Sequence, residues 1–430
     1  MSTDEARSTP RQADPAPSNS LRALFRVPGY RYLCVSSFVW HTTRWGGLFT
    51  TSYLLAQMSG SPILNQVVGA LVFAPMLVGG FVAGVISDRL DRRKLVRGVQ
   101  LVLIPIQFAM FGLVQSGRVQ IWMTLPFMFA LGIGGLVNMT AQRPLIYETV
   151  GPRFAGQAMT IEATAQAGSA MFGTLAGGAL IDRVGMGAGF AGMGVLLCIS
   201  ASLLWLVPRP RHATPRAPAA RVSIATQAAA SVRLARGSRR LMATLGVTVA
   251  MNLFMFGYIP LVPIVAGEFS TDAVLAGALG AASGCGQILC GTILSTRALH
   301  RRGLVFAVGS MVALLGLFCF SIAPVFEFAF LALFVAGLGQ AAFGSMQSLL
   351  AIESAHATER GVALGVLSTA IGAMPIGMVA IGAGAEMLGT RNALMISSLV
   401  GMAAVLTVVL RLRDLLTAAP ETALRPSPGA

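Results

Sequence analysis

The chemistry available to this chain centres on a histidine and an arginine that lie three residues apart in an apolar stretch. His41 and Arg44 belong to the stretch Tyr32–Met58 and share one face if that stretch is helical. An unperturbed histidine titrates at a pH of about 6.5 and can carry a proton. A guanidinium binds carboxylate and phosphate groups. The two side chains could therefore bind an anionic group and move a proton at one place.

Glu162 is the only acidic residue clearly inside an apolar stretch, and it allows two hypotheses for the arginine. In a structural one, Arg44 pairs with Glu162 or with an amide such as Gln166, and the contact stabilises the helices. In a functional one, Arg44 binds an anionic group of a ligand, while His41 or Glu162 carries a coupling proton. Trp45 adjoins the arginine and belongs to the same candidate site. The sequence leaves both hypotheses open.

Polar side chains also recur in other apolar stretches, where they could face a shared cavity or form hydrogen bonds between packed helices. The candidates are Asn138, Gln142, Gln166, Asn252, Tyr258, Gln287, Gln340 and Gln347. The sequence contains no nucleophile with a partnered base, no metal-ligand cluster and no Gly-x-x-x-x-Gly-Lys-Ser/Thr loop. We therefore expect no enzyme activity, no metal, no cofactor and no direct coupling to ATP.

Membrane-spanning helices must position these side chains, because 55% of the 430 residues are hydrophobic and only 11% are charged. A helix needs about 20 apolar residues to cross a bilayer, whereas barrel strands alternate over about ten. The long apolar stretches predict an all-α membrane protein with about twelve transmembrane helices. Their expected limits are Tyr32–Met58, Ile63–Ser87, Leu95–Gln115, Gln120–Leu145, Gln157–Leu180, Gly187–Val207, Leu241–Ala266, Ala273–Thr296, Leu304–Ala323, Phe328–Ile352, Gly361–Ala385 and Asn392–Leu410.

Arginine is distributed unevenly between the expected spans. One set of connections holds the basic residues within 22–31, 89–97, 209–240, 297–302 and 411–413, whereas the other set holds only Arg118, Arg183 and Arg391. Because positively charged loops face the cytoplasm, both termini are expected there, which agrees with an even number of spans. These loops at a membrane surface explain the net charge of +15, so nucleic acid is not an expected partner.

The two halves of the chain repeat at a nearly constant spacing. The matched positions are Asp88 with Arg297, Arg92 with Arg301, Arg93 with Arg302, Gln142 with Gln347, Glu148 with Glu353 and Gly185 with Gly389. Such a repeat implies two six-helix bundles with a ligand site between them near the midplane. The expected layout is a tail at 1–31, a bundle at 32–207, a basic linker at 208–240, a second bundle at 241–410 and a tail at 411–430.

A charged connection follows the second span and carries a recognisable pattern. Gly84, Asp88, Arg89, Arg92 and Arg93 form the order Gly-x-x-x-Asp-Arg-x-x-Arg-Arg between two apolar stretches. With this pattern the chain resembles the major facilitator superfamily over nearly all of its length after Leu21. Within that superfamily it looks most like the bacterial enterobactin and macrolide exporters, on the stretches 59–62, 141–145 and 359–361.

The resemblance implies a latch made by the charged connection. Asp88 would accept hydrogen bonds from backbone amides at the start of the eleventh span, near residues 358–361. Arg92 and Arg93 would pair with carboxylates at the same end of the bundle and hold the two halves together there. The candidate carboxylates are Glu148, Glu353 and Glu359. Because Arg297 replaces the acid in the second half, Asp88 would be the only acidic latch of this kind.

The resemblance also implies a function. We expect a multi-pass, monomeric transporter of the bacterial plasma membrane that works by alternating access. It would export an amphiphilic or anionic small molecule, such as a drug or a siderophore-like compound, in exchange for protons. Its partners would be the small-molecule substrate, protons and membrane lipids. Two alternatives are proton-coupled uptake in the same fold and a non-transporting assembly or scaffold protein of the membrane.

Overall fold

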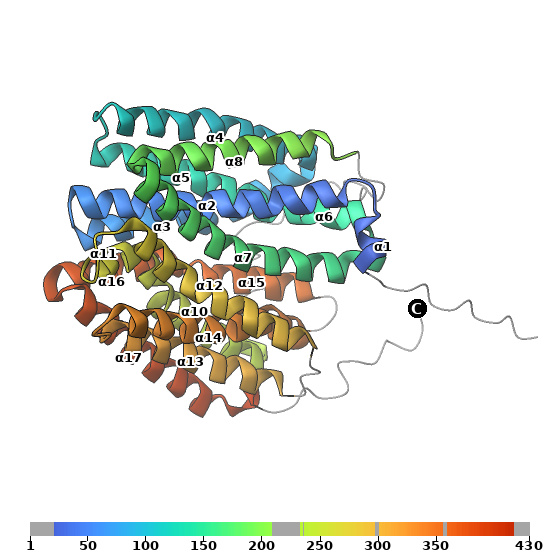
Figure 1. Ribbon diagram of the computed structural model, residues 1–430. Coiled ribbons are helices and arrows are strands. Elements are labelled where there is room, and N and C mark those ends of the chain that lie inside the picture. Colours follow the sequence, from blue (N-terminus) through green and yellow to red (C-terminus); the bar gives the residue numbers. More distant parts are fainter. Residues whose placement is uncertain (1–20, 209–232, 235, 297–300, 356–358, 417–430) are drawn as a thin grey trace, which may run out of the picture.

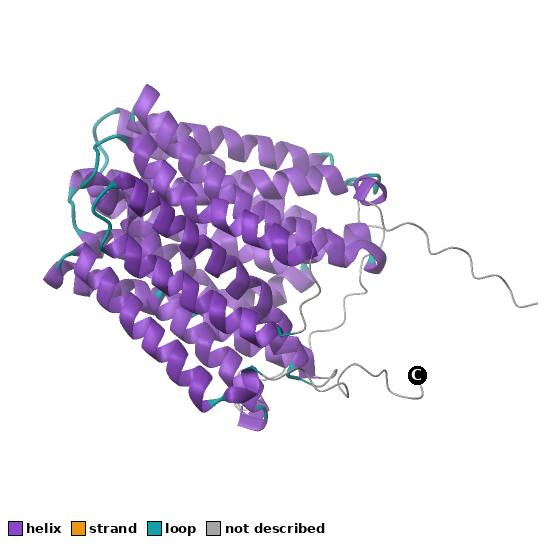
Figure 2. Ribbon diagram, turned by 60° about the horizontal axis from the view of Figure 1, so that its bottom comes forward, coloured by secondary structure: helices purple, strands orange, loops and turns teal. Residues whose placement is uncertain are grey.

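The structure is a computed structural model that describes residues 21–208, 233–234, 236–296, 301–355 and 359–416. Within these ranges the regular elements are helices, and none is a strand (Figure 2). The expected all-α class is therefore confirmed. Helices satisfy their own backbone hydrogen bonds, as a chain surrounded by lipid requires.

The helices follow the expected spans. Those of the first half are α1 (Leu21–Phe25), α2 (Tyr30–Met58), α3 (Pro62–Arg89), α4 (Arg92–Gln115), α5 (Ile121–Val137), η1 (Asn138–Gln142), α6 (Arg143–Val150), α7 (Pro152–Val184) and α8 (Met186–Trp205). Those of the second half are α10 (Arg239–Phe254), η2 (Phe256–Leu261), α11 (Val262–Gly267), α12 (Ala273–Thr296), α13 (Arg302–Ser321), α14 (Phe326–Glu353), α15 (Arg360–Ile371), α16 (Met374–Leu388), α17 (Thr390–Arg411) and η4 (Arg413–Leu415). The twelve expected spans are present when α5 to α6, α10 to α11 and α15 to α16 each count as one interrupted span.

In the described part of the chain, 9 helical segments are long and apolar enough to cross a membrane. The long helices α2 and α7 are not among them, because polar side chains such as His41, Arg44 and Glu162 lower their hydropathy. The described apolar part of α3, Pro62–Leu77, is shorter than a full span. These two helices carry three of the candidate site residues.

The helices form two groups (Figure 1). Helices α2 to α8 lie together, and α10 to α17 lie together on the other side of the molecule. A single glycine precedes the last spanning helix of each group: Gly185 before α8 has a φ of 115°, and Gly389 before α17 has a φ of 85°. Glycine adopts such angles without the steric cost of a Cβ atom. The sequence repeat thus corresponds to equivalent tight turns in the two groups.

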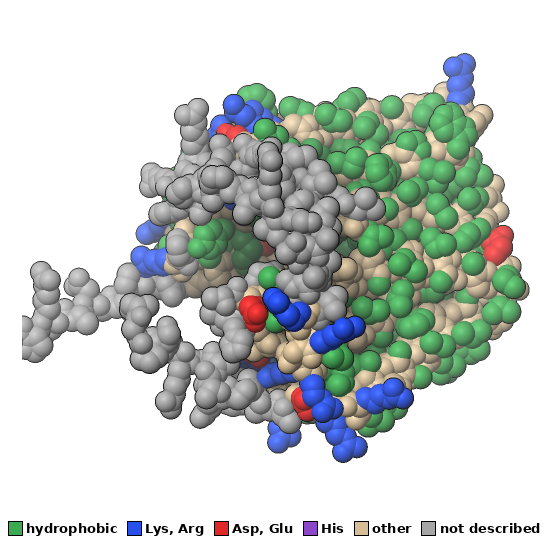
Figure 3. Space-filling model, turned by 180° about the vertical axis from the view of Figure 1, so that it is seen from behind, with side chains coloured by type: hydrophobic (Ala, Val, Ile, Leu, Met, Phe, Trp, Pro, Cys, Tyr) green, Lys and Arg blue, Asp and Glu red, His purple; other side chains and the backbone are tan. Residues whose placement is uncertain are grey.

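Charged side chains distinguish the two ends of the bundle. One end, called here the arginine-rich end, carries Arg92, Arg240 and Arg302, and the described chain both begins and ends there, at α1 and η4 (Figure 1). In the face shown in Figure 3, lysine and arginine gather at this end, and the surface beyond them is mostly hydrophobic. Such a distribution suits a bundle whose middle contacts lipid and whose ends meet water.

The two groups pack closely at the opposite end. The Tyr53 hydroxyl donates to the Thr271 carbonyl oxygen at 2.8 Å, which joins α2 to the segment before α12. A Cβ atom added at Gly178 of α7 would lie 2.4 Å from the carbonyl oxygen of Ala273, and one added at Gly277 of α12 would lie 2.6 Å from a carbonyl oxygen of α7. Only glycine fits such contacts, so α7 and α12 approach as closely as helices can.

Three spans are interrupted. The fourth contains the π-helical turn η1, and π turns occur frequently at functional sites. The seventh contains the 3₁₀ segment η2 with Pro260, which has no amide to donate. The eleventh breaks between α15 and α16, where Pro375 lies in the first turn of α16. The apolar pattern predicts the spans but not these interruptions, because they depend on local backbone geometry.

Candidate functional site

A buried hydrogen-bonded group joins α2 to α7 inside the first half. The Glu162 carboxylate accepts a hydrogen bond from the Ser37 hydroxyl at 2.6 Å and lies 3.2 Å from Nε2 of His41. Ser37 and His41 are one turn apart on α2, so both reach the same carboxylate. The side chains of His41 and Glu162 are each only 3% exposed. The group can therefore hold a proton between a histidine and a carboxylate away from bulk water.

Arg44 lies further along α2 and does not join this group. Its guanidinium carbon is 4.9 Å from the ring centre of Phe73 and 5.8 Å from that of Trp45. Its Nε and Nη2 atoms are buried and have no hydrogen-bond partner in the described part of the chain. The described contacts do not include a pairing of Arg44 with Glu162 or Gln166, which was one of the two hypotheses from the sequence: Glu162 bonds to α2 side chains one turn earlier, and Gln166 bonds to a different arginine.

Two consecutive glycines of α5 make room for side chains of α2. A Cβ atom added at Gly135 would lie 3.0 Å from Nε of Arg44, and one added at Gly134 would lie 2.4 Å from the Trp40 ring. The guanidinium and the indole therefore pack directly against the α5 backbone. The sequence prediction omitted both glycines, although a Gly-Gly pair in a spanning helix is a signal for close contact between helices.

A second arginine enters the site from the fourth span. Nη2 of Arg143 donates to Oε1 of Gln166 at 2.9 Å, which joins α6 to α7. The same guanidinium is within electrostatic range of His41, Arg44 and Glu162. The sequence prediction omitted Arg143 because it ended the fourth span two residues later, where an arginine is ordinary. Helix α6 instead continues to the end of the span and places this arginine about 10 Å inside it.

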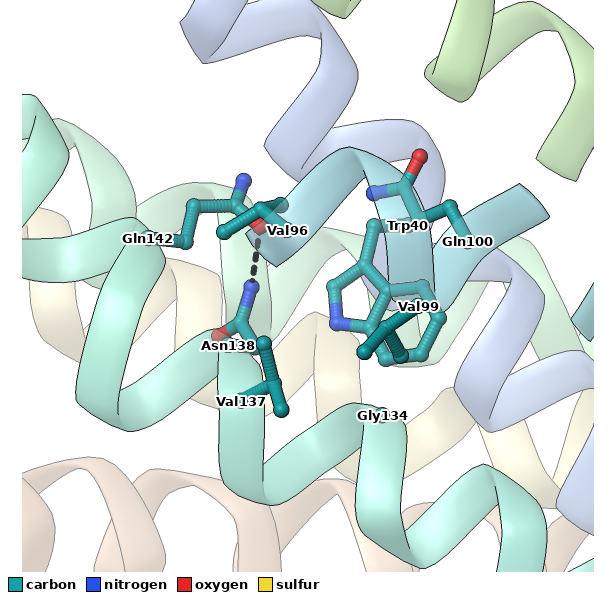
Figure 4. Close-up of a pocket in the computed structure, with 8 residues that line it drawn as sticks. All are labelled: Trp40, Val96, Val99, Gln100, Gly134, Val137, Asn138 and Gln142. Atoms are coloured by element: carbon teal, nitrogen blue, oxygen red, sulfur yellow. Dashed lines mark hydrogen bonds between the residues drawn. The ribbon is translucent and has the colours of Figure 1, made fainter. Parts of the chain in front are cut away.

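A small cavity lies between α2, α4 and the fourth span (Figure 4). Nδ2 of Asn138 donates to Oε1 of Gln142 at 2.6 Å across the π-helical turn, and Trp40 lies beside Gln100. The cavity has a volume of about 10 Å³, which is room for about one water molecule. Both polar atoms of the Gln100 side chain are buried without a partner among the described residues. Gln100 is thus a further candidate residue that the sequence prediction omitted.

The second half brings three of the expected residues together. Nε2 of Gln340 donates to the Tyr258 hydroxyl at 3.2 Å, and Nε2 of Gln287 donates to Oε1 of Gln340 at 3.3 Å. This chain of hydrogen bonds joins η2, α12 and α14. Asn252 does not belong to it and donates to a carbonyl one turn earlier in its own helix at 2.8 Å. The side-chain oxygen of Gln347 is buried and has no partner in the part that the structure describes.

The arginine-rich end has an ion pair at matching places in the two halves. Nη1 of Arg92, the first residue of α4, lies 2.5 Å from Oε1 of Glu148. Arg302, the first residue of α13, pairs with Glu353, which also lies 3.3 Å from Arg240. The pairing of Arg92 with Glu148 agrees with the expectation. The described contacts join helices within each half, however, and do not hold the halves to each other.

Among the described residues, Arg93 does not pair with a carboxylate as expected. Its Nη1 donates to the carbonyl oxygen of Val207 at 2.5 Å, because its side chain is directed toward the end of α8. Asp91, which the sequence prediction did not single out, caps α4 by accepting hydrogen bonds from the amides of Arg93 and Lys94 at 3.0 and 3.2 Å. Such a cap contributes about 1 kcal/mol to helix stability.

Part of the expected latch lies outside the described residues. The side chains of residues 78–89 are not described, and they include Gly84, Asp88 and Arg89. Residues 356–358, close to where Asp88 is expected to dock, and most of the linker 208–240 are not described either. The Asp88 latch and the role of the linker therefore stay predictions.

Comparison with protein families matches residues 33–377 to the Major Facilitator Superfamily. Among solved structures, the inward-open xylose transporter XylE from E. coli is similar with a TM-score of 0.68 and 15% identity, over 93% of this chain and 98% of that one. A bacterial homologue of the human lysosomal transporter Spinster, inward-facing and occupied, is similar with a TM-score of 0.69 and 14% identity, over 93% and 98% of the two chains. These likenesses show a shared fold.

A further similarity covers part of the chain. The Probable anion transporter 3, chloroplastic, from Oryza sativa subsp. japonica is 30% identical over 155 residues. The match covers 32% of this chain and 27% of that protein, so this chain spans about a quarter of the relative's length.

Proposed function

Because the chain belongs to the Major Facilitator Superfamily, we propose that it is a proton-coupled transporter that exports an anionic or amphiphilic small molecule across the bacterial plasma membrane. Its two halves would rearrange around a shared site, with both termini in the cytoplasm and a monomer as the working unit. The packing of α7 against α12 would seal the opposite end in one state and open in another. Arginine-rich connections at one end support this orientation.

Unpaired hydrogen-bond donors of Arg44 and its neighbours carry the proposal. Nε and Nη2 of Arg44, Nε of Arg143 and Nε1 of Trp45 are buried without a partner among the described residues. All of these atoms are donors, and an unsatisfied buried donor costs about 1–3 kcal/mol. Glu162 does not satisfy them among the described contacts, where its carboxylate bonds to Ser37 and His41. An anionic group with several acceptor oxygens would satisfy these donors and balance the two arginine charges.

The surroundings of Arg44 also support an amphiphilic substrate. The rings of Phe73 and Trp45 lie beside its guanidinium and supply an apolar wall next to the charge. A molecule with a carboxylate and an apolar body would match both features. The partial similarity to a protein named as a probable anion transporter agrees with a negatively charged substrate.

We propose that His41 and Glu162 carry the coupling proton. They are buried and 3.2 Å apart, and they belong to α2 and α7 respectively. A change in their protonation would therefore change the contact between two helices of the first half. Histidine is the side chain whose ordinary pKa lies closest to physiological pH. Membrane lipids would surround the bundle, and the transport cycle would need no cofactor.

Uptake is the second candidate, and one observation favours it. A proton on the His41–Glu162 pair and an anion on Arg44 would attract each other at this short range, so each would strengthen the binding of the other. Mutual strengthening suits movement of both in the same direction. Export, by contrast, is supported by the resemblance of the charged connection and its neighbours to bacterial exporters.

An accumulation assay tests the proposal and its direction. Cells that lack their own exporters would express the protein and receive a panel of amphiphilic carboxylic acids with their methyl esters, with and without a protonophore. Export predicts lower accumulation of at least one acid, and uptake predicts higher accumulation, with the protonophore abolishing either effect. Arg44→Gln should abolish the effect, whereas Arg118→Gln, at an exposed position, should keep it.

The same assay can reject transport. If accumulation of every acid and ester is the same with and without the protein, although the protein reaches the membrane, the proposal fails. A non-transporting assembly or scaffold role would then be the better account.

A further inference from the structure

A groove lies on the outer face of the first half, separate from the polar site. It runs along α4 from Lys94 to Ile106 and is bounded on its other side by Ala130 and Ile133 of α5, with a volume of about 420 Å³. Its apolar side chains are open to the surroundings, since Val102 is 62% exposed and Ile133 is 41% exposed. An exposed apolar groove on a spanning helix faces the hydrocarbon of the membrane.

The dimensions of the groove fit one acyl chain. Lys94, Gly98, Val102 and Ile106 recur every four residues on α4 and form one stripe of the groove. From Lys94 to Ile106 the helix rises about 18 Å, and one leaflet of the hydrocarbon core is about 15 Å thick. A Cβ atom added at Gly98 would meet no atom within 4 Å, so the stripe is open at that point.

The charged end of the groove fits an anionic headgroup. Lys94 is exposed in the first turn of α4, where the helix dipole adds positive partial charge. One turn later, the Arg97 guanidinium carbon lies 3.7 Å from the ring centre of Trp205, close to the same end. Asp91 also lines this end of the groove and caps α4 by accepting hydrogen bonds from two backbone amides, so one carboxylate faces the two cations Lys94 and Arg97.

We propose that the groove between α4 and α5 binds an anionic phospholipid, with one acyl chain along the stripe and the phosphate against Lys94. The lipid would belong to the leaflet at the arginine-rich end. It would cover the outer face of α4, whose inner face carries Gln100 and packs beside the π-helical turn. The site is independent of the substrate proposed above.

Native mass spectrometry of the purified full-length protein tests the proposal. Phosphatidylglycerol and phosphatidylcholine with the same acyl chains are compared at equal concentration. Wild type should retain phosphatidylglycerol about fivefold better than phosphatidylcholine, and Lys94→Gln should remove that preference. Gly98→Leu adds a side chain at a point where a Cβ atom would meet no atom within 4 Å, and by occupying the groove it should reduce retention of both lipids by about tenfold. Gly112→Leu lies in equally open space on the same helix and should bind as wild type does.

Lys94 allows a second measurement because it is the only lysine in the chain. Phosphatidylglycerol should protect its amine from acetylation, whereas phosphatidylcholine should not. Equal lipid retention by Gly98→Leu and Gly112→Leu, or an unchanged preference in Lys94→Gln, would overturn the proposal. Loss of substrate transport in Gly98→Leu with unchanged lipid retention would also overturn it and assign the groove to the substrate.

Discussion

Replacing Glu162 with glutamine removes a buried charge but keeps the shape of the side chain. Glu162 is 3% exposed and accepts a hydrogen bond from Ser37 at 2.6 Å. A hydrogen bond to a charged group contributes about 1.5–3 kcal/mol, and one between neutral groups contributes about 0.5–1.5 kcal/mol. Glu162→Gln should therefore lower the free energy of unfolding by about 1–2 kcal/mol. Glu162→Ala, which leaves Ser37 and His41 without this partner, should lower it by about 3–5 kcal/mol.

A transport assay of Glu162→Gln separates its effect on proton coupling from its effect on stability. Glutamine cannot exchange a proton at physiological pH, so the protonophore-sensitive change in accumulation should be lost in Glu162→Gln while ligand binding to the purified protein remains. Glu327→Gln removes a carboxylate at an exposed position and should change neither property. If folded Glu162→Gln transported at the wild-type rate with the same response to a protonophore, the reasoning about the coupling proton would be refuted.

Three further substitutions test the packing. Gly134→Ala should lower the free energy of unfolding by about 1–3 kcal/mol, because the added Cβ lies 2.4 Å from the buried Trp40 ring. Its melting temperature should fall, whereas that of Gly112→Ala, where the added Cβ lies in open space, should not. Glu148→Gln should cost about 1–2 kcal/mol by weakening the ion pair that joins α4 to α6, and an unchanged chemical denaturation midpoint would contradict this. Gly277→Val should abolish transport at normal expression and lengthen spin-label distances between α7 and α12, because a Cβ atom added there lies 2.6 Å from a backbone carbonyl oxygen. Transport at the wild-type rate in this variant would argue against closure at that end.

The fold is largely predictable because membrane spans depend on length and apolar composition. The long apolar stretches predicted all twelve spans. The internal repeat predicted that the two halves contain equivalent elements. Gly185 and Gly389 form matching turns, for example. The repeat matched Glu148 with Glu353, and each of these carboxylates pairs with an arginine at the start of the third span of its half. In the second half Arg302 makes this contact, one position later than the residue matched to Arg92, because α13 begins there.

The partners within the site were not predictable, because they depend on how each helix is rotated. His41 and Arg44 are three residues apart, and about 3.6 residues complete a turn, so their side chains point about 60° apart. That difference directs the histidine toward α7 and the arginine toward the α5 backbone at Gly135. Arg143 was missed for a related reason, since the end of a span is less certain from composition than its existence.

The central claim is that Arg44 and its neighbouring donors bind an anionic group, and ligand-dependent thermal stability of the purified protein tests it most directly. A ligand that binds only the folded state stabilises it by about 2.7 kcal/mol at a concentration of 100 times its Kd. We predict that at least one amphiphilic carboxylic acid raises Tm and that its methyl ester does not. Arg44→Gln should lose this response, and Arg118→Gln should retain it. Equal stabilisation by acid and ester, or an unchanged response in Arg44→Gln, would contradict the claim.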